Sequence, residues 1–162
     1  MLTLPADPLD ALAGLLAGRR TAVLSGAGLS TDSGIPDYRG PTTRGVARNP
    51  VQYDDFVRSA EARRRYWARA ARGWARIFEA APNAGHHALA RLEVAGHVSG
   101  TVTQNVDGLH QAAGAQAVVD LHGRLDRIVC LGCPAVWARG RAGAHRGAQP
   151  GLDGRRPVEA RT

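Results

Sequence analysis

The chain has 162 residues, of which 44% are hydrophobic, so it is long enough for one packed domain. It has no apolar run of the roughly 18 residues that span a bilayer, and no basic segment precedes an apolar stretch at the N-terminus. These patterns argue against a membrane protein or a secreted one and predict a cytoplasmic protein without a membrane partner. The net charge is +7, and all 21 cationic residues are arginine, which reflects coding bias as much as a binding surface. We therefore expect no specific nucleic-acid partner.

The first third of the chain predicts a helix, a strand and a long loop. Asp7 and Pro8 have the N-cap and first-turn pattern of a helix that ends near Gly18, with one apolar face formed by leucines. The apolar run over 21–25 predicts a buried strand. A loop rich in glycine and proline follows from Gly26 to about Pro50, and a loop of that length in a compact domain is usually functional.

The middle of the chain alternates helices with strands. Helices are predicted over about 59–78, 84–93 and 108–114, and strands over 98–103 and 117–121. This alternation is typical of an α/β fold with a parallel sheet. Aromatic side chains at helical spacing in 59–78 are expected to pack into the core rather than to bind a ligand.

Two polar segments follow predicted strands. The turn after strand 21–25 reads G-A-G-x-S-x-x-S-G, and glycines there let backbone N–H groups approach a phosphate. Its spacing differs from the G-x-G-x-x-G of dehydrogenases, because Thr31 stands where the third glycine would be. The second segment, Thr103 to His110, places amides and a carboxylate at a strand end, where they could bind a ligand or only satisfy the turn.

His122 follows the apolar run over 118–121, at another strand end. A neutral imidazole near pH 7 can accept a proton in a general-base step, although a histidine in such a place is often structural.

Cys130 and Cys133 form a C-x-x-C pair, which in a cytosolic chain suggests a metal site or redox chemistry more than a disulfide. Structural zinc takes four ligands, and the sequence after Cys133 holds no further cysteine and one histidine, His145. Residues 134–162 carry six arginines against Asp153 and Glu159 and have few bulky apolar side chains. This composition predicts a disordered tail.

Together these segments closely resemble the sirtuins, the NAD-dependent protein deacylases. The resemblance runs from about Leu12 to Cys133 and includes Pro82-Asn83 and Leu121-His122-Gly123. The blocks Arg65 to Arg69 and Gly73-Trp74 are similar to the bacterial and mitochondrial branch of lipoamidase and ADP-ribosyltransferase type. The expected fold is a Rossmann-like parallel-sheet sirtuin domain over 1–133, incomplete, with the start of a zinc ribbon at 127–133. The later sirtuin segments are not recognisable after Cys133, which suggests a missing or frameshifted C-terminal part.

The resemblance implies roles for individual residues. His122 matches the catalytic base, and the acyl group of an acyl-lysine protein would pass to ADP-ribose as nicotinamide leaves. Cys130 and Cys133 match the first two of four zinc ligands. The residues that match the NAD-binding positions are Gly26, Ala27, Gly28, Ser30, Ile35, Asp37, Tyr38, Arg39, Gln104, Asn105 and Asp107.

Some alternatives stay open at this point. Tyr66 and Arg69 form a Y-x-x-R spacing that could hold the carboxylate of an acidic acyl group, although they also belong to the branch-specific block. The other reading of the whole chain is an inactive remnant that binds nucleotide weakly.

Overall fold

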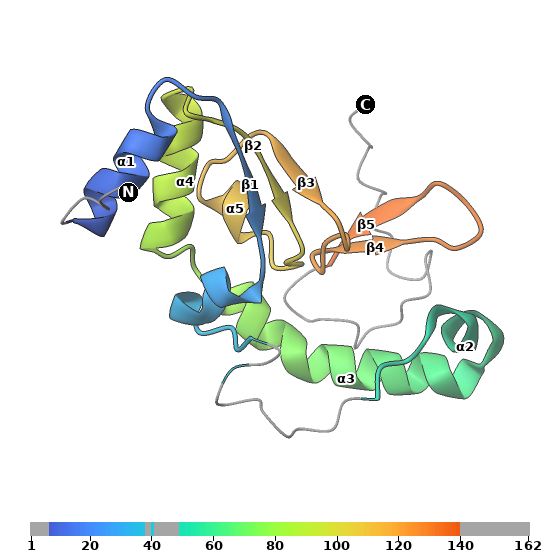
Figure 1. Ribbon diagram of the computed structural model, residues 1–162. Coiled ribbons are helices and arrows are strands. Elements are labelled where there is room, and N and C mark those ends of the chain that lie inside the picture. The colour runs from blue at the N-terminus through green and yellow to red at the C-terminus, as the bar shows by residue number, and fades with distance from the viewer. Residues whose placement is uncertain (1–6, 38–39, 41–48, 140–162) are drawn as a thin grey trace.

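A three-stranded parallel sheet forms the centre of the computed structural model, which describes residues 7–37, 40 and 49–139 (Figure 1). Its strands are β1 (Thr21–Ser25), β2 (Val98–Thr103) and β3 (Val118–Asp120), in the order β1-β2-β3. The register pairs Ser25 with Thr103 and Thr103 with Asp120, so all three strands end at the same edge. The α/β class and the parallel sheet predicted from the sequence are thus confirmed.

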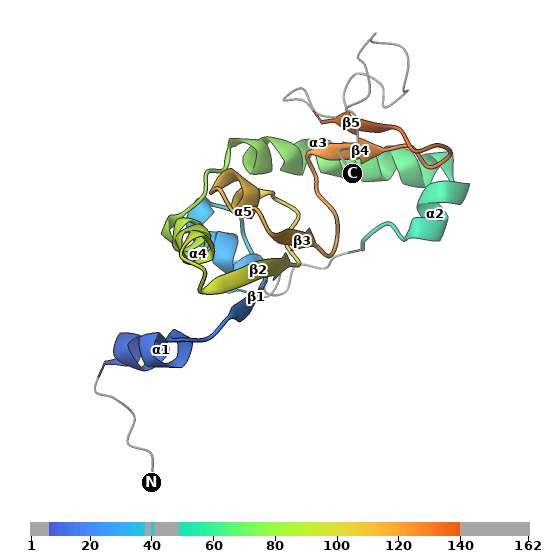
Figure 2. The same ribbon diagram turned by 90° about the horizontal axis from the view of Figure 1, so that it is seen from above.

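Two helices complete the sheet region. Helix α4 (Ala84–Val94) begins with a capping box in which the Asn83 side chain accepts hydrogen bonds from backbone N–H groups while His86 contacts the Asn83 backbone. Helix α5 (Leu109–Ala112) follows β2, and α4 and α5 lie close together (Figure 2). Because His86, Ala90, Val98 and Leu109 are all buried, this contact forms the core of the sheet region.

Helix α1 (Pro8–Leu16) begins as predicted, with the Asp7 carboxylate accepting a hydrogen bond from the Leu9 N–H and proline in the first turn. Its apolar face is nevertheless open to solvent, because Leu9, Leu12 and Leu15 are 72%, 51% and 60% exposed. Leu24 and Val119 of the sheet are also exposed. Among the described residues, no helix is both long and apolar enough to span a membrane.

A second region consists of α2 (Tyr53–Arg58), the 20-residue α3 (Ala60–Glu79) and a hairpin of β4 (Arg127–Val129) with β5 (Val136–Ala138). The hairpin lies alongside α3 in both views (Figures 1 and 2). Arg139, which is 6% exposed, joins them: its guanidinium lies 4.4 Å from the Trp74 ring centroid and donates to the Ala70 carbonyl at 3.0 Å. Cation–π contact and a hydrogen bond therefore fix the end of the hairpin on the helix.

Three features differ from the sequence predictions. Residues Ala27–Ser33, expected in a loop, form the 3-10 helix η1, and α2 lies in a segment for which no helix was predicted. Disorder was predicted from Pro134 onward, but Val136–Ala138 pair antiparallel with β4 and Arg139 is buried. The remaining tail, 140–162, lies outside the described residues.

The aromatic residues of α3 divide between core and surface, since Trp74 is buried and Phe78 is exposed.

Replacing Arg139 by methionine is expected to lower the free energy of unfolding by about 2 kcal/mol, because the variant keeps most of the apolar stem but loses the cation–π contact and the bond to Ala70. Urea unfolding measures the effect, and amide exchange should rise first in β4 and β5. Arg72→Ala, an exposed change in the middle of α3, is the matched control and should stay within about 0.5 kcal/mol. Equal stability of the Arg139 variant and the native chain would contradict this account of how the hairpin is held.

Candidate functional site

The carboxyl edge of the parallel sheet gathers the residues that the sequence singled out. Gly26 directly follows β1, and Gln104 directly follows β2. His122 lies in the turn after β3, two residues beyond the end of that strand. The register aligns these strand ends, and the Gln104 and Leu121 N–H groups donate to the Ser25 and Thr103 carbonyls, which continues the pairing by one residue. Ligands of open α/β sheets bind at this edge.

A hydrogen-bonded cluster joins the two polar segments. The Ser30 hydroxyl donates to Asp107 Oδ2 at 2.7 Å, and Asn105 Nδ2 donates to Ser30 Oγ at 3.1 Å and to the Gly26 carbonyl at 3.0 Å. Ser30 is 1% exposed and Asn105 is 8% exposed, so these bonds are shielded from water. Asp107 also accepts the Leu109 N–H through Oδ1. The glycine turn and the second motif therefore form one rigid unit, with the exposed Gln104 beside it.

A second polar chain lies behind this cluster and was not predicted from the sequence. The Ser25 hydroxyl donates to Thr103 Oγ1 at 2.8 Å and lies 2.7 Å from His110 Nε2. Thr103 Oγ1 in turn accepts the Asn105 N–H at 3.1 Å. The available signal was a hydroxyl side chain at the last position of two strands: Ser25 just before the glycine turn, and Thr103 at the start of the second segment.

His110 and His86 form a buried pair, with ring centroids 5.2 Å apart and exposures of 1% and 0%. Burial lowers the pKa of each ring below 6.5, and His110 lowers the pKa of His86 further. The negative charge of Asp107 opposes this effect at both rings, and that of Asp120 opposes it at His110. Both rings are thus neutral at pH 7.

These pKa shifts predict that stability falls on acidification. The unfolded chain takes up protons at His86 and His110 below pH 6.5, whereas the folded chain resists them, so stability is complete above about pH 6.5 and decreases below it. The expected slope is up to about 1.4 kcal/mol per pH unit for each histidine. Urea unfolding from pH 7.5 to pH 5 measures it. His110→Gln should reduce the slope, the same change at the exposed His97 should not, and an unchanged stability would refute the prediction.

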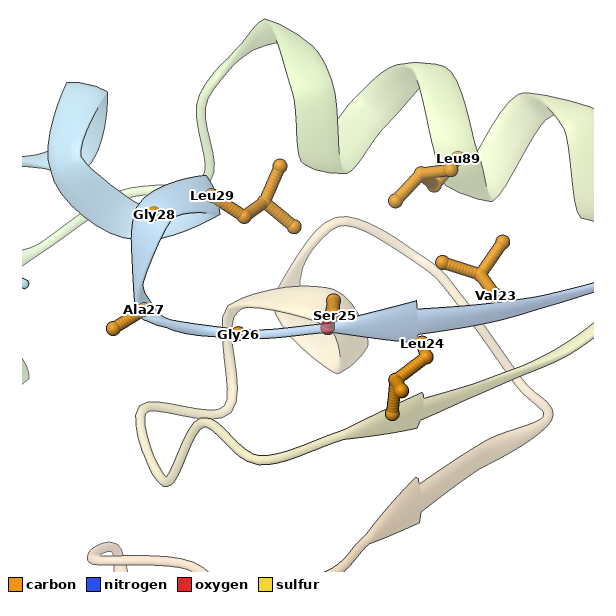
Figure 3. A pocket seen from close by; sticks show the side chains of 8 residues that line it. All are labelled: Val23, Leu24, Ser25, Gly26, Ala27, Gly28, Leu29 and Leu89. Atoms are coloured by element: carbon orange, nitrogen blue, oxygen red, sulfur yellow. The ribbon is translucent and has the colours of Figure 1, made fainter.

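The glycine turn borders an open cavity of about 440 Å³ (Figure 3). Leu29, Leu89 and Val23 lie between β1 and α4, whereas Leu24 points to the other side of the strand. A Cβ atom at Gly28 would meet no described atom within 4 Å, and one at Gly26 would meet only Gln104 Oε1, at 4.0 Å. Neither glycine has a positive φ. Packing against the described residues does not require glycine there, and the bare backbone N–H groups of such a turn can approach a dinucleotide phosphate.

The remaining predicted cofactor residues are partly described. Ala27 begins η1, the Ile35 N–H donates to the Ser30 carbonyl, and Asp37 Oδ1 accepts the Gly40 N–H at 2.7 Å. Tyr38 and Arg39 lie outside the described residues.

His122 is exposed in the turn that leads from the sheet to the hairpin. The Gly123 N–H donates to the Asp120 carbonyl, and the Asp120 carboxylate accepts two hydrogen bonds from Gln111 Nε2. These bonds hold Asp120, the residue at which the turn begins, in place. An exposed imidazole at this edge can reach a ligand that lies over the strand ends.

Tyr66 and Arg69 are engaged with different partners. Tyr66 packs edge-on against Phe56 and Trp67 and lines a cavity of about 360 Å³ between α2, α3 and β4. The Arg69 guanidinium donates to the Asn49 carbonyl. The structure therefore shows no shared carboxylate-binding fork from these two side chains among the described residues.

Cys130 and Cys133 lie in the turn between β4 and β5. The Gly132 N–H donates to Cys130 Sγ at 3.4 Å, and this bond and Cys133 lower the pKa of the Cys130 thiol. Over residues 7–37, 40 and 49–139, no group of three or more metal-ligating side chains comes together. The described part of the chain therefore does not bring together the four ligands of a tetrahedral zinc site.

A parallel sheet with a bare glycine turn and a polar cluster at its carboxyl edge defines the class of nucleotide-binding α/β proteins. The model of the Sir2 family matches residues 26–149, and this chain belongs to that family. The match extends beyond Cys133, where the sequence resemblance had been taken to end.

Curated relatives agree with this assignment. The chain is 56% identical over 117 residues to NAD-dependent protein deacetylase 1 of Streptomyces coelicolor. The aligned segment covers 72% of this chain and 39% of the relative. It is 55% identical over 128 residues to NAD-dependent protein deacetylase 1 of Mycobacterium avium, covering 79% and 45%. The chain therefore spans less than half the length of these two relatives.

Solved structures show the same fold. An ADP-ribose complex of a mutant Sir2 homologue aligns with a TM-score of 0.74 at 30% identity, over 92% of this chain and 59% of that one. A Sir2 complex with p53 peptide and NAD⁺ aligns with a TM-score of 0.68 at 36% identity, over 82% and 52%.

Proposed function

We propose that this chain carries the NAD-binding and catalytic edge of an NAD-dependent protein lysine deacylase. The observation that carries the proposal is the meeting of the bare glycine turn, the Ser30–Asn105–Asp107 cluster and the His122 turn at one sheet edge. The curated relatives are named as NAD-dependent deacetylases, and two of the similar solved structures hold an acetylated peptide or a peptide with NAD⁺.

In this proposal each group has a distinct task. The backbone of Gly26, Ala27 and Gly28 receives the phosphates, and Asn105 and Asp107 present an amide and a carboxylate to the ribose and the carboxamide. The overall reaction transfers an acyl group from lysine to ADP-ribose and releases nicotinamide. His122 accepts the proton of a ribose hydroxyl in that transfer. The segment with Ile35, Asp37, Tyr38 and Arg39 shields the site from water, which protects a reactive sugar from hydrolysis.

Two finer assignments belong to the same proposal. Arg65 to Arg69 and Gly73-Trp74 support the lipoamidase and ADP-ribosyltransferase type branch. Cys130 and Cys133 are proposed as two ligands of a structural zinc ion, because a tight turn with an N–H bond to Cys130 Sγ favours the thiolate that zinc binds.

Nicotinamide release from NAD tests the function. The purified chain is incubated with acetyl-, lipoyl- and succinyl-lysine peptides, beside His122→Ala and the exposed-histidine control His97→Ala. We expect release that depends on one acyl peptide, about 10²- to 10⁴-fold slower in His122→Ala and unchanged in His97→Ala.

Calorimetry with ADP-ribose separates binding from chemistry in the same samples. ADP-ribose binding without release would point to the alternative, a nucleotide-binding protein without activity. Release that ignores the acyl peptides would contradict a deacylase, and a slow deacylation that His122→Ala leaves unchanged would contradict the assigned base.

A further inference from the structure

His110 lies at a junction that the proposed chemistry does not use. Its Nε2 atom is 2.7 Å from Ser25 Oγ, at the last residue of β1, and Ser25 Oγ is 2.8 Å from Thr103 Oγ1, at the last residue of β2. One imidazole is therefore bonded to the point where the two motif-bearing strands end.

The hydrogen bonds set the protonation of this ring. The bond between Ser25 Oγ and His110 Nε2 can run in either direction, and only the tautomer that carries its proton on Nε2 and donates it to Ser25 Oγ leaves no buried N–H of this ring unpaired. His110 Nδ1 is buried and has no hydrogen-bond partner among the described residues, and the same holds for His86 Nε2. The His86 ring packs edge-on against His110 and fixes its orientation from α4.

The chain of bonds continues from His110 to the cofactor cluster. Thr103 Oγ1, besides accepting from Ser25, accepts the Asn105 N–H, and Asn105 Nδ2 holds Ser30 Oγ and the Gly26 carbonyl. A change at His110 thus reaches the glycine turn through Ser25 and reaches Asn105 through Thr103. The ring itself is 1% exposed and does not reach the cavity, so it acts through these residues and not on a ligand.

We propose that His110, as its neutral Nε2–H tautomer, is a positioning residue that locks the ends of β1 and β2 at the spacing the dinucleotide requires. This inference rests on the proposed function, since it assigns His110 a part in the same site. Three titratable groups lie near the ring, each from a different part of the fold: Asp107 from the loop before α5, Asp120 from β3, and His86 from α4. His86 in turn lies near His87. Protonation of His110 places a second donor on Nδ1, where no group of the described residues accepts it, and so loosens the junction.

The experiment is ADP-ribose affinity, measured by calorimetry at pH 8, 7 and 5.5, for the native chain and five variants. His110→Phe keeps the bulk but removes the donor, and Ser25→Ala removes the acceptor; each is expected to weaken binding about tenfold at pH 8. The double variant should bind ADP-ribose about as weakly as the single variant with the lower affinity, because both changes break the same hydrogen bond. His110→Gln can keep an N–H near Ser25 and should bind within about threefold of the native chain. The same exchange at the exposed His97 is the control and should change nothing.

The pH profile separates positioning from bulk packing. The native chain should bind alike at pH 8 and pH 7 and lose affinity at pH 5.5, because burial holds the pKa of His110 below 6.5, whereas His110→Gln, which has no ring to protonate at this position, should lose less. Native-like affinity in a folded His110→Phe, or additive losses in the double variant, would overturn the inference. If His110→Phe does not fold, Ser25→Ala is the smaller change that tests the inference. Native-like affinity in a folded Ser25→Ala chain would then overturn it. A native chain that binds no ADP-ribose would instead overturn the proposed function itself, and this inference with it.

Discussion

Gly28→Ala is expected to weaken ADP-ribose binding at least tenfold while leaving the free energy of unfolding within about 0.5 kcal/mol of the native value. The reason is the unusual freedom of this glycine: a Cβ atom there meets no described atom, and no positive φ stands in its way. The methyl group would lie where the turn offers its bare backbone to a phosphate. We expect at least a tenfold loss of affinity by calorimetry and an unchanged urea midpoint.

Two other glycines make the Gly28 result interpretable. Gly14 in α1 also has free space around it, so Gly14→Ala should raise stability by about 0.5–1 kcal/mol and leave binding intact. At Gly85 a Cβ atom would lie 2.9 Å from Leu29 Cδ1 and 3.2 Å from Asn83 Oδ1, so Gly85→Ala should destabilise the fold. Unchanged affinity in Gly28→Ala would show that the turn is not the phosphate cradle.

Asn105→Ala is expected to lower both stability and affinity. The amide is 8% exposed and bonds the Gly26 carbonyl and Ser30 Oγ, so its removal leaves two groups without their partner and costs about 1–3 kcal/mol. Asn105→Asp should be at least as harmful, because an acceptor then faces the Gly26 carbonyl. Urea unfolding and calorimetry on the same samples measure the two effects. Gln116→Ala, at an exposed amide, is the control, and an Asn105→Ala chain as stable as that control would contradict the cluster.

Local sequence patterns predicted most of the sheet region because its signals are local. The Asp7–Pro8 cap and the apolar run of β1 each mark an element within a few residues. Both motifs and His122 were located correctly at strand ends for the same reason. Their meeting at one edge followed from the parallel sheet.

The features that were missed depend on distant partners. Strand β5 lies in a segment whose arginine- and glycine-rich composition predicted disorder, and its order comes from pairing with β4 and from Arg139 on α3. Helix α2 has six residues and no side-chain cap, so little in the sequence marks it. The Ser25–Thr103–His110 chain joins residues up to 85 positions apart, which no local pattern could reveal. Tyr66 and Arg69 contact different partners in this structure, and their binding of a shared carboxylate stays a prediction.

The distribution of tryptophan has a practical consequence. All three tryptophans of the chain lie in α3 or β5: Trp67 and Trp74 on the helix beside Arg139, and Trp137 in the hairpin, paired with Ile128. The sheet region and the glycine turn contain none. Intrinsic fluorescence of this protein therefore reports the contact between the hairpin and α3, so an emission change on adding a nucleotide would be evidence that the two regions communicate.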